Sequence, residues 1–416
     1  MSRFPTFQDK MQSAGGVTTG FDYLRIGLSV AVLGWHANSL TARSLELDEA
    51  LWSGPFRFLP AAIIPMFFAL SGFLVAGSLG RTRLHQFVTL RVVRLIPALA
   101  VEITLSAVII GLIFTTLPAS QYFSSGEFCA YFLNIVGDIH FYLPGVFVEE
   151  PSQGLVNGQL WTVPFELECY LALVLLAIAR PTRRRFAFVA VMAVVSLTLT
   201  VRVLLGHPIS SVTHAPGRAL VFCFLAGVGL HLCRDVVPHS GLLAVVSAVA
   251  AAAFLQVANL SYLCAFPVAY LTAYLGLMRP PAIPFGDLSY GVYLFHWPIQ
   301  QSIVHAIPSI DSWWLMLLIS LPSTAVCAWL SWNLVEKPIL VRKKPILAAV
   351  DRAWAAIPAP GRLVGQHRPI KVQVSAGAAA QAKGLGRKQP VPLDPSPLGK
   401  PQHSDLIGER IVADQT

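Results

Sequence analysis

The stretch FDYLRIGLSVAVLGWHANSL, residues 21–40, is a run of mostly apolar side chains. A helix of about 20 residues is roughly 30 Å long, which matches the thickness of the hydrocarbon core of a bilayer. Similar runs recur along the first 335 residues, and the whole chain is 55% hydrophobic and only 12% charged. A soluble domain carries about 25% charged residues. The sequence therefore predicts an all-α protein embedded in a membrane.

Hydropathy predicts a bundle of ten transmembrane helices in one membrane domain, residues 21–340. The expected spans are residues 21–41, 57–79, 95–117, 160–180, 186–206, 216–234, 240–258, 260–278, 285–306 and 313–335. Residues 1–20 are expected to form a short cytosolic segment before the first span. Residues 341–416 are expected to form a cytosolic tail of low complexity, with a short interfacial helix at 346–357 and disorder from about residue 358.

The distribution of basic residues predicts the orientation, because cytoplasmic loops of membrane proteins are rich in Lys and Arg. Alternate connections hold the basic residues Arg81, Arg83, Arg91, Arg94, Arg180, Arg183, Arg184, Arg185, Arg234, Arg279, Lys337, Arg342, Lys343 and Lys344. The opposite connections hold Glu46, Asp48, Glu49, Glu127, Asp138, Glu149, Glu150, His207, His214 and Asp311. Both termini are then expected in the cytoplasm.

The apolar stretch 128–147 is expected not to span, because a helix there would invert every later loop. It contains Asn134, Asp138 and His140, and it is predicted to lie at the interface or to re-enter the membrane. The surrounding outer loop, residues 118–158, is the candidate region for selecting an acceptor substrate.

The net charge of +9 does not indicate a nucleic-acid partner, since the basic residues flank apolar runs or lie in the tail. The six cysteines lack metal-ligand spacing, and most lie inside apolar runs. Neither a metal site nor a disulfide framework is expected.

Arg25 and His36 are the first pair of ionisable residues inside a predicted span. They are eleven positions apart, so both project from one face of a helix, roughly 16 Å apart along its axis. Ionisable side chains at membrane depth mark functional sites unless they reach the interface. The alternative is that Arg25 extends to the interface and His36 is a packing residue.

Glu166 is expected at the same depth as His36 in the membrane. A carboxylate beside an imidazole would fix its tautomer and stabilise its protonated form, as a general base requires. Glu168 points roughly 200° away from Glu166 on the helix, so only one of the two is expected to face the site. A purely structural pair between Glu166 and an arginine or histidine is the alternative.

Arg91 and Arg94 are three residues apart at the predicted cytosolic interface, and so are neighbours on one helix face. Guanidinium groups bind phosphate oxygens in bidentate fashion, so the pair is a candidate for holding a phosphorylated donor. Simple anchoring by positive charge at the cytosolic face is the alternative.

The segment DLSYGVYLFHWPI, residues 287–299, contains a second intramembrane histidine. Tyr290 and Tyr293 lie three positions apart, and His296 follows deeper in the membrane. An aromatic stripe alone usually serves packing, whereas a histidine beside it suggests a functional role.

Six motifs in this order resemble the membrane-bound acyltransferase 3 family, which includes bacterial O-antigen, exopolysaccharide and Nod-factor O-acetyltransferases. The resemblance covers about residues 20–340. The motifs are FDYLRIGLSVAVLGWHA (21–37), MFFALSGFLV (66–75), LRVVRLIP (90–97), LWTVPFELECY (160–170), FGDLSYGVYLFHWP (285–298) and VEKP (335–338).

The resemblance implies acyl-CoA, usually acetyl-CoA, as a cytosolic co-substrate, with no permanently bound cofactor. It implies as acceptor a sugar hydroxyl of an envelope or secreted glycan, or of a lipid-linked precursor. It also implies that His36 is the catalytic base, that Arg25 is its partner in the same motif, and that Arg91 and Arg94 bind the phosphates of the donor.

Glu166 is the further candidate for catalysis, and Tyr290 and Tyr293 are further candidates for donor binding. The expected location is the bacterial inner membrane, in contact with its lipids. Two other function classes stay open: a proton-coupled transporter of a small polar solute, in which these residues form the substrate and proton path, and a non-catalytic scaffold.

Overall fold

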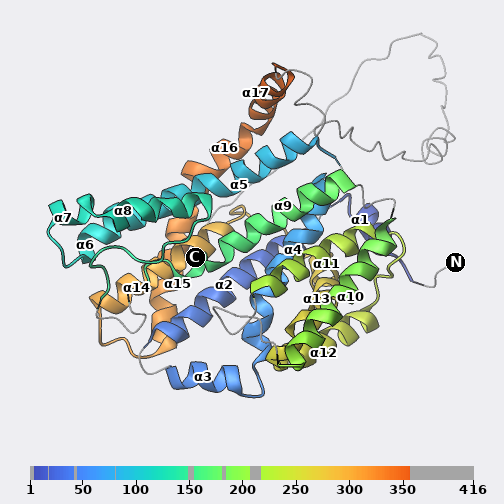
Figure 1. Ribbon diagram of the computed structural model, residues 1–416, viewed down its shortest axis with the longest axis horizontal. Coiled ribbons are helices and arrows are strands. Elements are labelled where there is room, and N and C mark those ends of the chain that lie inside the picture. The colour runs from blue at the N-terminus through green and yellow to red at the C-terminus, as the bar shows by residue number, and fades with distance from the viewer. Residues whose placement is uncertain are drawn as a thin grey trace, which may run out of the picture. The chain divides into compact units, whose positions relative to one another are not determined.

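The computed structural model describes residues 4–16, 18–41, 45–79, 81–148, 154–179, 184–206 and 217–356, and its regular elements there are all helices (Figure 1). They are α1 (Phe7–Ser13), α2 (Gly20–Leu40), α3 (Leu45–Ser53), α4 (Phe58–Leu79), α5 (Leu84–Leu105), η2 (Ser106–Ile110), α6 (Gly111–Phe114), α7 (Ala119–Ser124), α8 (Gly126–Tyr131), η3 (Phe132–Val136), η4 (Gly158–Thr162), α9 (Val163–Ala179), α10 (Arg185–Leu204), α11 (Gly217–Leu232), α12 (Gly241–Gln256), η6 (Ala258–Cys264), α13 (Ala265–Gly276), α14 (Ser289–Ala306), α15 (Trp313–Ser331), η7 (Trp332–Glu336), α16 (Lys337–Val341) and α17 (Lys343–Ala356).

Five helical segments in the described part are long and apolar enough to cross a membrane by length and composition. They are Phe58–Ser78, Leu84–Phe114, Gly158–Ile178, Arg185–Leu204 and Trp313–Val341. These five coincide with five of the predicted spans, and the other five predicted spans overlap helices that are shorter or more polar. That all ten cross the bilayer is part of the proposal below.

Large apolar side chains cover the outer faces of several helices. Leu171 on α9, Val194 on α10 and Val249 on α12 are between 60 and 66% exposed. Proteins dissolved in water rarely expose contiguous apolar surface of this kind. Hydrocarbon is the solvent that suits these faces, and the chain is a helical membrane protein.

Helix α2 packs against α4 and α13 and also against α14 and α15. Polar contacts fix it there. The hydroxyl of Ser29 lies 2.8 Å from the carbonyl oxygen of Arg25 and 2.9 Å from that of Ser289 at the start of α14. The amide of Gln300 on α14 donates to the carbonyl of Leu33 on α2.

Helices α4 and α11 approach each other closely through glycine. A Cβ atom on Gly72 would overlap the backbone oxygen of Phe224, and one on Gly227 would overlap that of Ala69. Without side chains at these two positions the backbones pack directly, as is common between helices in membranes. The pair forms the wall against which α9 and α13 pack.

The stretch 128–147 forms short helices and irregular backbone. The apolar helical segment Gly126–Val136 is well short of the roughly 20 residues that a span needs. Asn134 closes the turn that follows it, because its side-chain amide donates to the carbonyl of His140 and its side-chain oxygen accepts the amide of His140. The chain therefore folds back on itself here.

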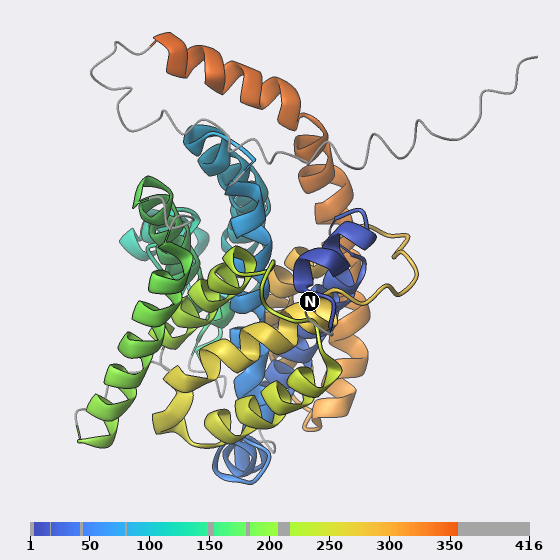
Figure 2. The same cartoon turned by 90° about the vertical axis from the view of Figure 1, so that its right-hand side faces the viewer.

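Helix α17 lies against the first turn of α5 (Figure 2). The carboxylate of Asp351 accepts hydrogen bonds from Nε2 of His85 at 2.6 Å and from the amide of Gln86 at 2.8 Å. The ring of Trp354 stacks on His85 at a centroid distance of 5.0 Å. The hydrogen bond from His85 holds the pKa of Asp351 below its usual range.

Several predictions fall outside the described residues. The predicted disorder concerns residues 358–416, and the loop charges Arg180, Arg183, Glu149, Glu150, His207 and His214 also lie there. The predicted helix at 346–357 coincides with most of α17.

Replacing Asp351 with Asn should loosen α17 from α5, because the side chain loses the charge that strengthens its hydrogen bonds. Hydrogen exchange of residues 343–356 at pH 7 should become about fivefold faster, as expected for the loss of roughly 1 kcal/mol, while exchange in α14 stays the same. Because the pKa of Asp351 is lowered on folding, the wild-type contact should persist at neutral pH and weaken only below about pH 4.

The control is Arg352→Gln, on the exposed side of the same helix. Equal exchange in Asp351→Asn and in the wild type would show that this contact does not hold α17.

Candidate active site

Two cavities of different chemistry meet inside the bundle. The first, called the aromatic cavity, has a volume of about 510 Å³ and includes His36 in its wall. The second, called the arginine cavity, has a volume of about 370 Å³. Ile64 on α4 and Tyr293 on α14 line both, so these two side chains form a collar between them.

His36 on α2 and His296 on α14 form a direct hydrogen bond, with Nδ1 of His36 2.6 Å from Nε2 of His296. The two rings are parallel to within 4°, with centroids 4.9 Å apart. Nδ1 of His296 lies 2.8 Å from the carbonyl oxygen of Tyr293, which can only accept a hydrogen bond. Nδ1 of His296 therefore carries a hydrogen, and its Nε2 is the acceptor.

The direction of this chain of hydrogen bonds decides the tautomer of His36. Its Nδ1–H donates to His296, which leaves the lone pair of its Nε2 free. Within the described residues Nε2 has no hydrogen-bond partner, and the ring is part of the wall of the aromatic cavity. An imidazole in this form can take a proton from a hydroxyl group in that cavity.

Aromatic packing holds the histidine pair in place. The ring of Trp297 meets His36 edge to face at 4.6 Å, and its indole N–H donates to the carbonyl of Leu155. The hydroxyl of Tyr293 donates to the carbonyl of Gln159 at 2.9 Å and lies 2.5 Å from the hydroxyl oxygen of Thr162. These contacts join α14 to η4.

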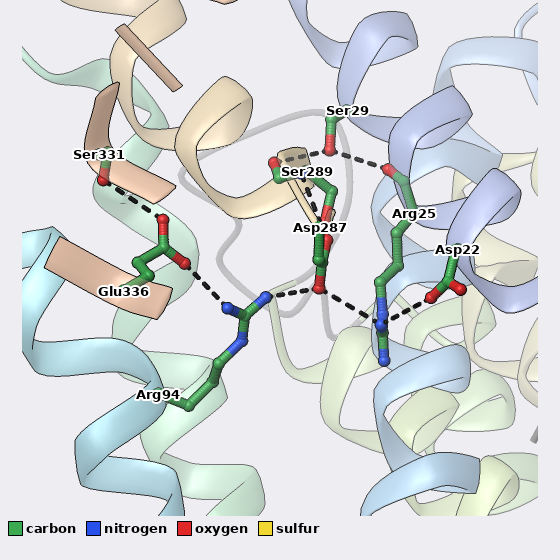
Figure 3. A network of polar contacts seen from close by, with 8 residues as sticks. All are labelled: Asp22, Arg25, Ser29, Arg94, Asp287, Ser289, Ser331 and Glu336. Carbon is green, nitrogen blue, oxygen red and sulfur yellow. Dashed lines mark hydrogen bonds and ion pairs between the residues drawn. The ribbon is translucent and has the colours of Figure 1, made fainter. Parts of the chain in front are cut away.

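Carboxylates hold two of the arginines beside the arginine cavity (Figure 3). Arg94 forms ion pairs with Asp287 at 2.6 Å and with Glu336 at 2.8 Å. Arg25 lies 3.4 Å from both Asp22 and Asp287. Asp287, just before α14, thus joins α2 to α5, and Glu336 adds the end of η7.

The other two arginines of this cavity, Arg81 and Arg91, form no ion pair with any acid in the described part of the chain. The Nε atom of Arg91 is buried there without a hydrogen-bond partner, and its guanidinium lies 5.7 Å from the ring of Phe87. Their donor groups are available to a ligand, and guanidinium binds the oxygens of a phosphate in bidentate fashion.

The predicted site residues divide between the two cavities. His36 lines the aromatic cavity. The arginine cavity brings together Arg25, Arg91, Arg94, Glu166, Tyr290 and Tyr293. Tyr290 is positioned by a hydrogen bond to the carbonyl of Leu95 and lies under the guanidinium of Arg94.

Glu166 and His36, which were predicted to meet, form no hydrogen bond or ion pair with each other among the described residues. Glu166 instead accepts a hydrogen bond of 2.5 Å from the hydroxyl of Tyr170, one turn later on α9, and lines the arginine cavity. The partner of His36 is His296. Depth in the membrane was the basis of the prediction, and depth alone does not place two helices side by side.

Three groups were not among the predicted site residues: His296 as the partner of His36, Arg81 as a free guanidinium, and the counter-ions Asp287 and Glu336. Asp287, His296 and Glu336 lie in the motifs FGDLSYGVYLFHWP and VEKP. Asp287 offered a signal, because its predicted span contains no Lys or Arg and an acid at membrane depth needs a cationic partner from another helix.

A family model described as an acyltransferase domain matches residues 18–332, which is most of the chain and includes both cavities. The chain belongs to the membrane-bound acyltransferase 3 family. This member of the acyltransferase 3 family is thus a membrane-embedded acyltransferase.

Two curated proteins are similar to this acyltransferase along nearly their whole length. Nodulation protein 10 of Rhizobium leguminosarum bv. viciae is 29% identical over 368 residues, covering 81% of this chain and 97% of that protein. An O-acetyl transferase of Shigella phage Sf6 is 26% identical over 341 residues, covering 79% and 98%. No solved structure matches the chain significantly.

Replacing His296 with Leu should reduce acyl transfer at least about tenfold, because His36 loses the acceptor that fixes its tautomer. His296→Gln should retain more activity, since an amide oxygen can accept from His36 while the amide nitrogen donates to Tyr293. The measurement is the transfer rate at saturating donor over a range of pH, where His296→Leu should also shift the profile.

The control is His231→Leu, which removes a buried histidine that lines neither cavity. An unchanged rate and pH profile in His296→Leu would mean that the hydrogen bond only packs the helices.

Proposed function

We propose that this acyltransferase moves a short acyl group, most simply acetyl, from acyl-CoA to a hydroxyl group of a bacterial cell-surface or secreted carbohydrate. The observation that carries the proposal is the meeting of two unlike cavities at Ile64 and Tyr293. One holds guanidinium groups suited to a phosphorylated donor, and the other holds an imidazole suited to activate a hydroxyl.

The donor end of the route is the arginine cavity. Arg81 and Arg91 offer unpaired guanidinium groups to the phosphates of CoA. Arg25 and Arg94 add positive charge that is partly neutralised by their carboxylate partners. In this proposal Glu166 acts from the donor side of the collar, where Tyr170 orients it.

The acceptor end is the aromatic cavity, where His36 is the proposed general base. Nε2 of His36 takes the proton of the acceptor hydroxyl as the hydroxyl oxygen bonds to the thioester carbonyl carbon. The carbon–sulfur bond then breaks, and the departing thiolate receives the proton from His36. An ester and free CoA result, and the imidazole is neutral again. His296 holds the ring in the required tautomer throughout.

The relatives support the choice of acyl group and acceptor atom. The phage Sf6 protein is an O-acetyl transferase by name, which describes acetyl transfer to oxygen. The proposed acceptor is a glycan or its lipid-linked precursor.

The proposed location is the bacterial inner membrane, with ten spans and both termini in the cytoplasm. The positive-inside rule supports this orientation, because Arg81, Arg91 and Arg94 then face the compartment that contains acyl-CoA.

The first test is mass spectrometry of surface and secreted glycans from strains that carry the intact protein, His36→Ala at equal membrane abundance, or a deletion. Loss of one acetyl-sized increment in both altered strains is expected, because the variant lacks the base. The control is His231→Ala, at a buried histidine that lines neither cavity.

Unchanged glycans in both altered strains would contradict the proposal for that host and would favour the transporter class. Loss of acylation in the deletion strain but not in His36→Ala would place the chemistry elsewhere in the protein.

The second test concerns the donor. Arg81→Gln and Arg91→Gln should each raise KM for acyl-CoA about tenfold or more, as expected when a charge-assisted contact to phosphate is lost. The value of kcat at saturating donor should change little, because these residues line the arginine cavity and the base lines the other. Arg342→Gln, an exposed arginine outside both cavities, is the matched control, and equal KM values in all four proteins would exclude Arg81 and Arg91 from donor binding.

A further inference from the structure

The aromatic cavity is nearly free of charge. Its described lining residues include no Asp, Glu, Lys or Arg, and His36 is the one histidine among them. The arginine cavity, on the other side of the collar, has four guanidinium groups in its wall. The two halves of the site therefore suit ligands of different charge.

An ionised sugar would be unfavourable in the aromatic cavity for two reasons. A carboxylate that leaves water without a cationic partner loses its hydration, which costs several kcal/mol. Among the described lining residues His36 is the one group able to compensate, and an ion pair with a carboxylate of the substrate would keep its imidazole protonated before the reaction begins. A protonated His36 cannot accept the proton of a hydroxyl group.

Seven aromatic residues line this cavity together with aliphatic and small side chains. They are Trp35, Trp52, Phe141, Tyr142, Trp161 and Trp297, together with Tyr293 of the collar. Trp35 and Trp52 pack edge to face at 5.3 Å, and Trp161 packs in the same way on Phe165 at 6.0 Å, which fixes the ring planes. Trp161 is half-buried, so part of its surface remains accessible.

A pyranose ring suits such a surface, since one of its faces consists largely of C–H groups. These carry a small positive charge and are attracted to the negative face of an indole ring. The hydroxyl groups lie around the edge of the sugar ring, where a base can reach them while one face of the ring is stacked. A volume of about 510 Å³ lies within the usual range of roughly 300–1,000 Å³ for small-molecule sites.

We infer that the aromatic cavity binds one uncharged pyranose unit of the acceptor, stacked on Trp161, and presents its hydroxyl group to Nε2 of His36. The inference rests on the proposed function and narrows its substrate class to carbohydrates whose acylated unit carries no acid group. Acidic units elsewhere in the same glycan remain outside the cavity.

The first arm of the test locates the ester. Tandem mass spectrometry of the glycan from the strain with the intact protein should place the acyl group on a neutral sugar. An acyl group on a uronic acid or another ionised unit would overturn the inference and leave the proposed function standing. Absence of any acylation that depends on the protein would overturn both.

The second arm measures stacking. The same glycan, freed of ester groups by mild alkali, is the acceptor for purified protein in lipid nanodiscs. Trp161→Ala should raise KM for this acceptor about tenfold, which corresponds to an aromatic contact of roughly 1.4 kcal/mol. Trp161→Phe keeps a ring and should stay within about threefold of the wild type. KM for acyl-CoA should be unchanged in both.

The matched control is Trp314→Ala, which removes an exposed tryptophan of α15 outside both cavities. Hydrolysis of acyl-CoA without acceptor reports whether each variant is folded and binds its donor. Wild-type acceptor KM in a folded Trp161→Ala protein would overturn the stacking. If Trp161→Ala fails to fold, Trp161→Leu replaces it, and the same comparison with Trp161→Phe decides.

Discussion

A polar group inside a bilayer has no water to bind, so its partner must come from the protein itself. The hydrogen bonds of His296 on helix α14 are an example. Nδ1 of His296 donates to a carbonyl one turn earlier on the same helix, which leaves Nε2 to accept from His36 on α2. The backbone of one helix therefore decides which nitrogen of a histidine on another helix is free.

The same constraint organises the charges. Asp287 has Arg25 on one side and Arg94 on the other, and Glu336 completes the coordination of Arg94 (Figure 3). These residues come from segments far apart in the sequence. Since each ion pair would leave an uncompensated charge if one member were lost, the network fixes the relative positions of α2, α5 and the start of α14. Arg81 and Arg91 stand outside it, and they are the arginines left for a ligand.

The division into two cavities gives each end of the proposed reaction its own environment. Cationic groups gather where a phosphorylated donor would bind, and they are absent from the described wall around His36. A base needs a neutral surrounding to stay unprotonated, whereas a phosphate needs positive charge. The collar residues Ile64 and Tyr293 line both cavities.

The sequence determined the helices and the family. A long apolar run satisfies its backbone polar groups within one helix in a bilayer, and five of the predicted spans coincide with helical segments long and apolar enough to cross it. The acyltransferase 3 motifs identified the family. The eleven-residue spacing of Arg25 and His36 also predicted their separation along one helix, and the two residues line different cavities.

The partners of these residues were decided by the tertiary structure. Glu166 and His36 were expected to meet because both lie at a similar depth, but depth is one coordinate of three. Their distance across the membrane plane depends on how α9, α2 and α14 pack, and packing follows from side-chain shape over the whole bundle. His296 became the partner of His36, and Asp287 that of Arg94, because helix packing brought them together, which no spacing along the chain encodes.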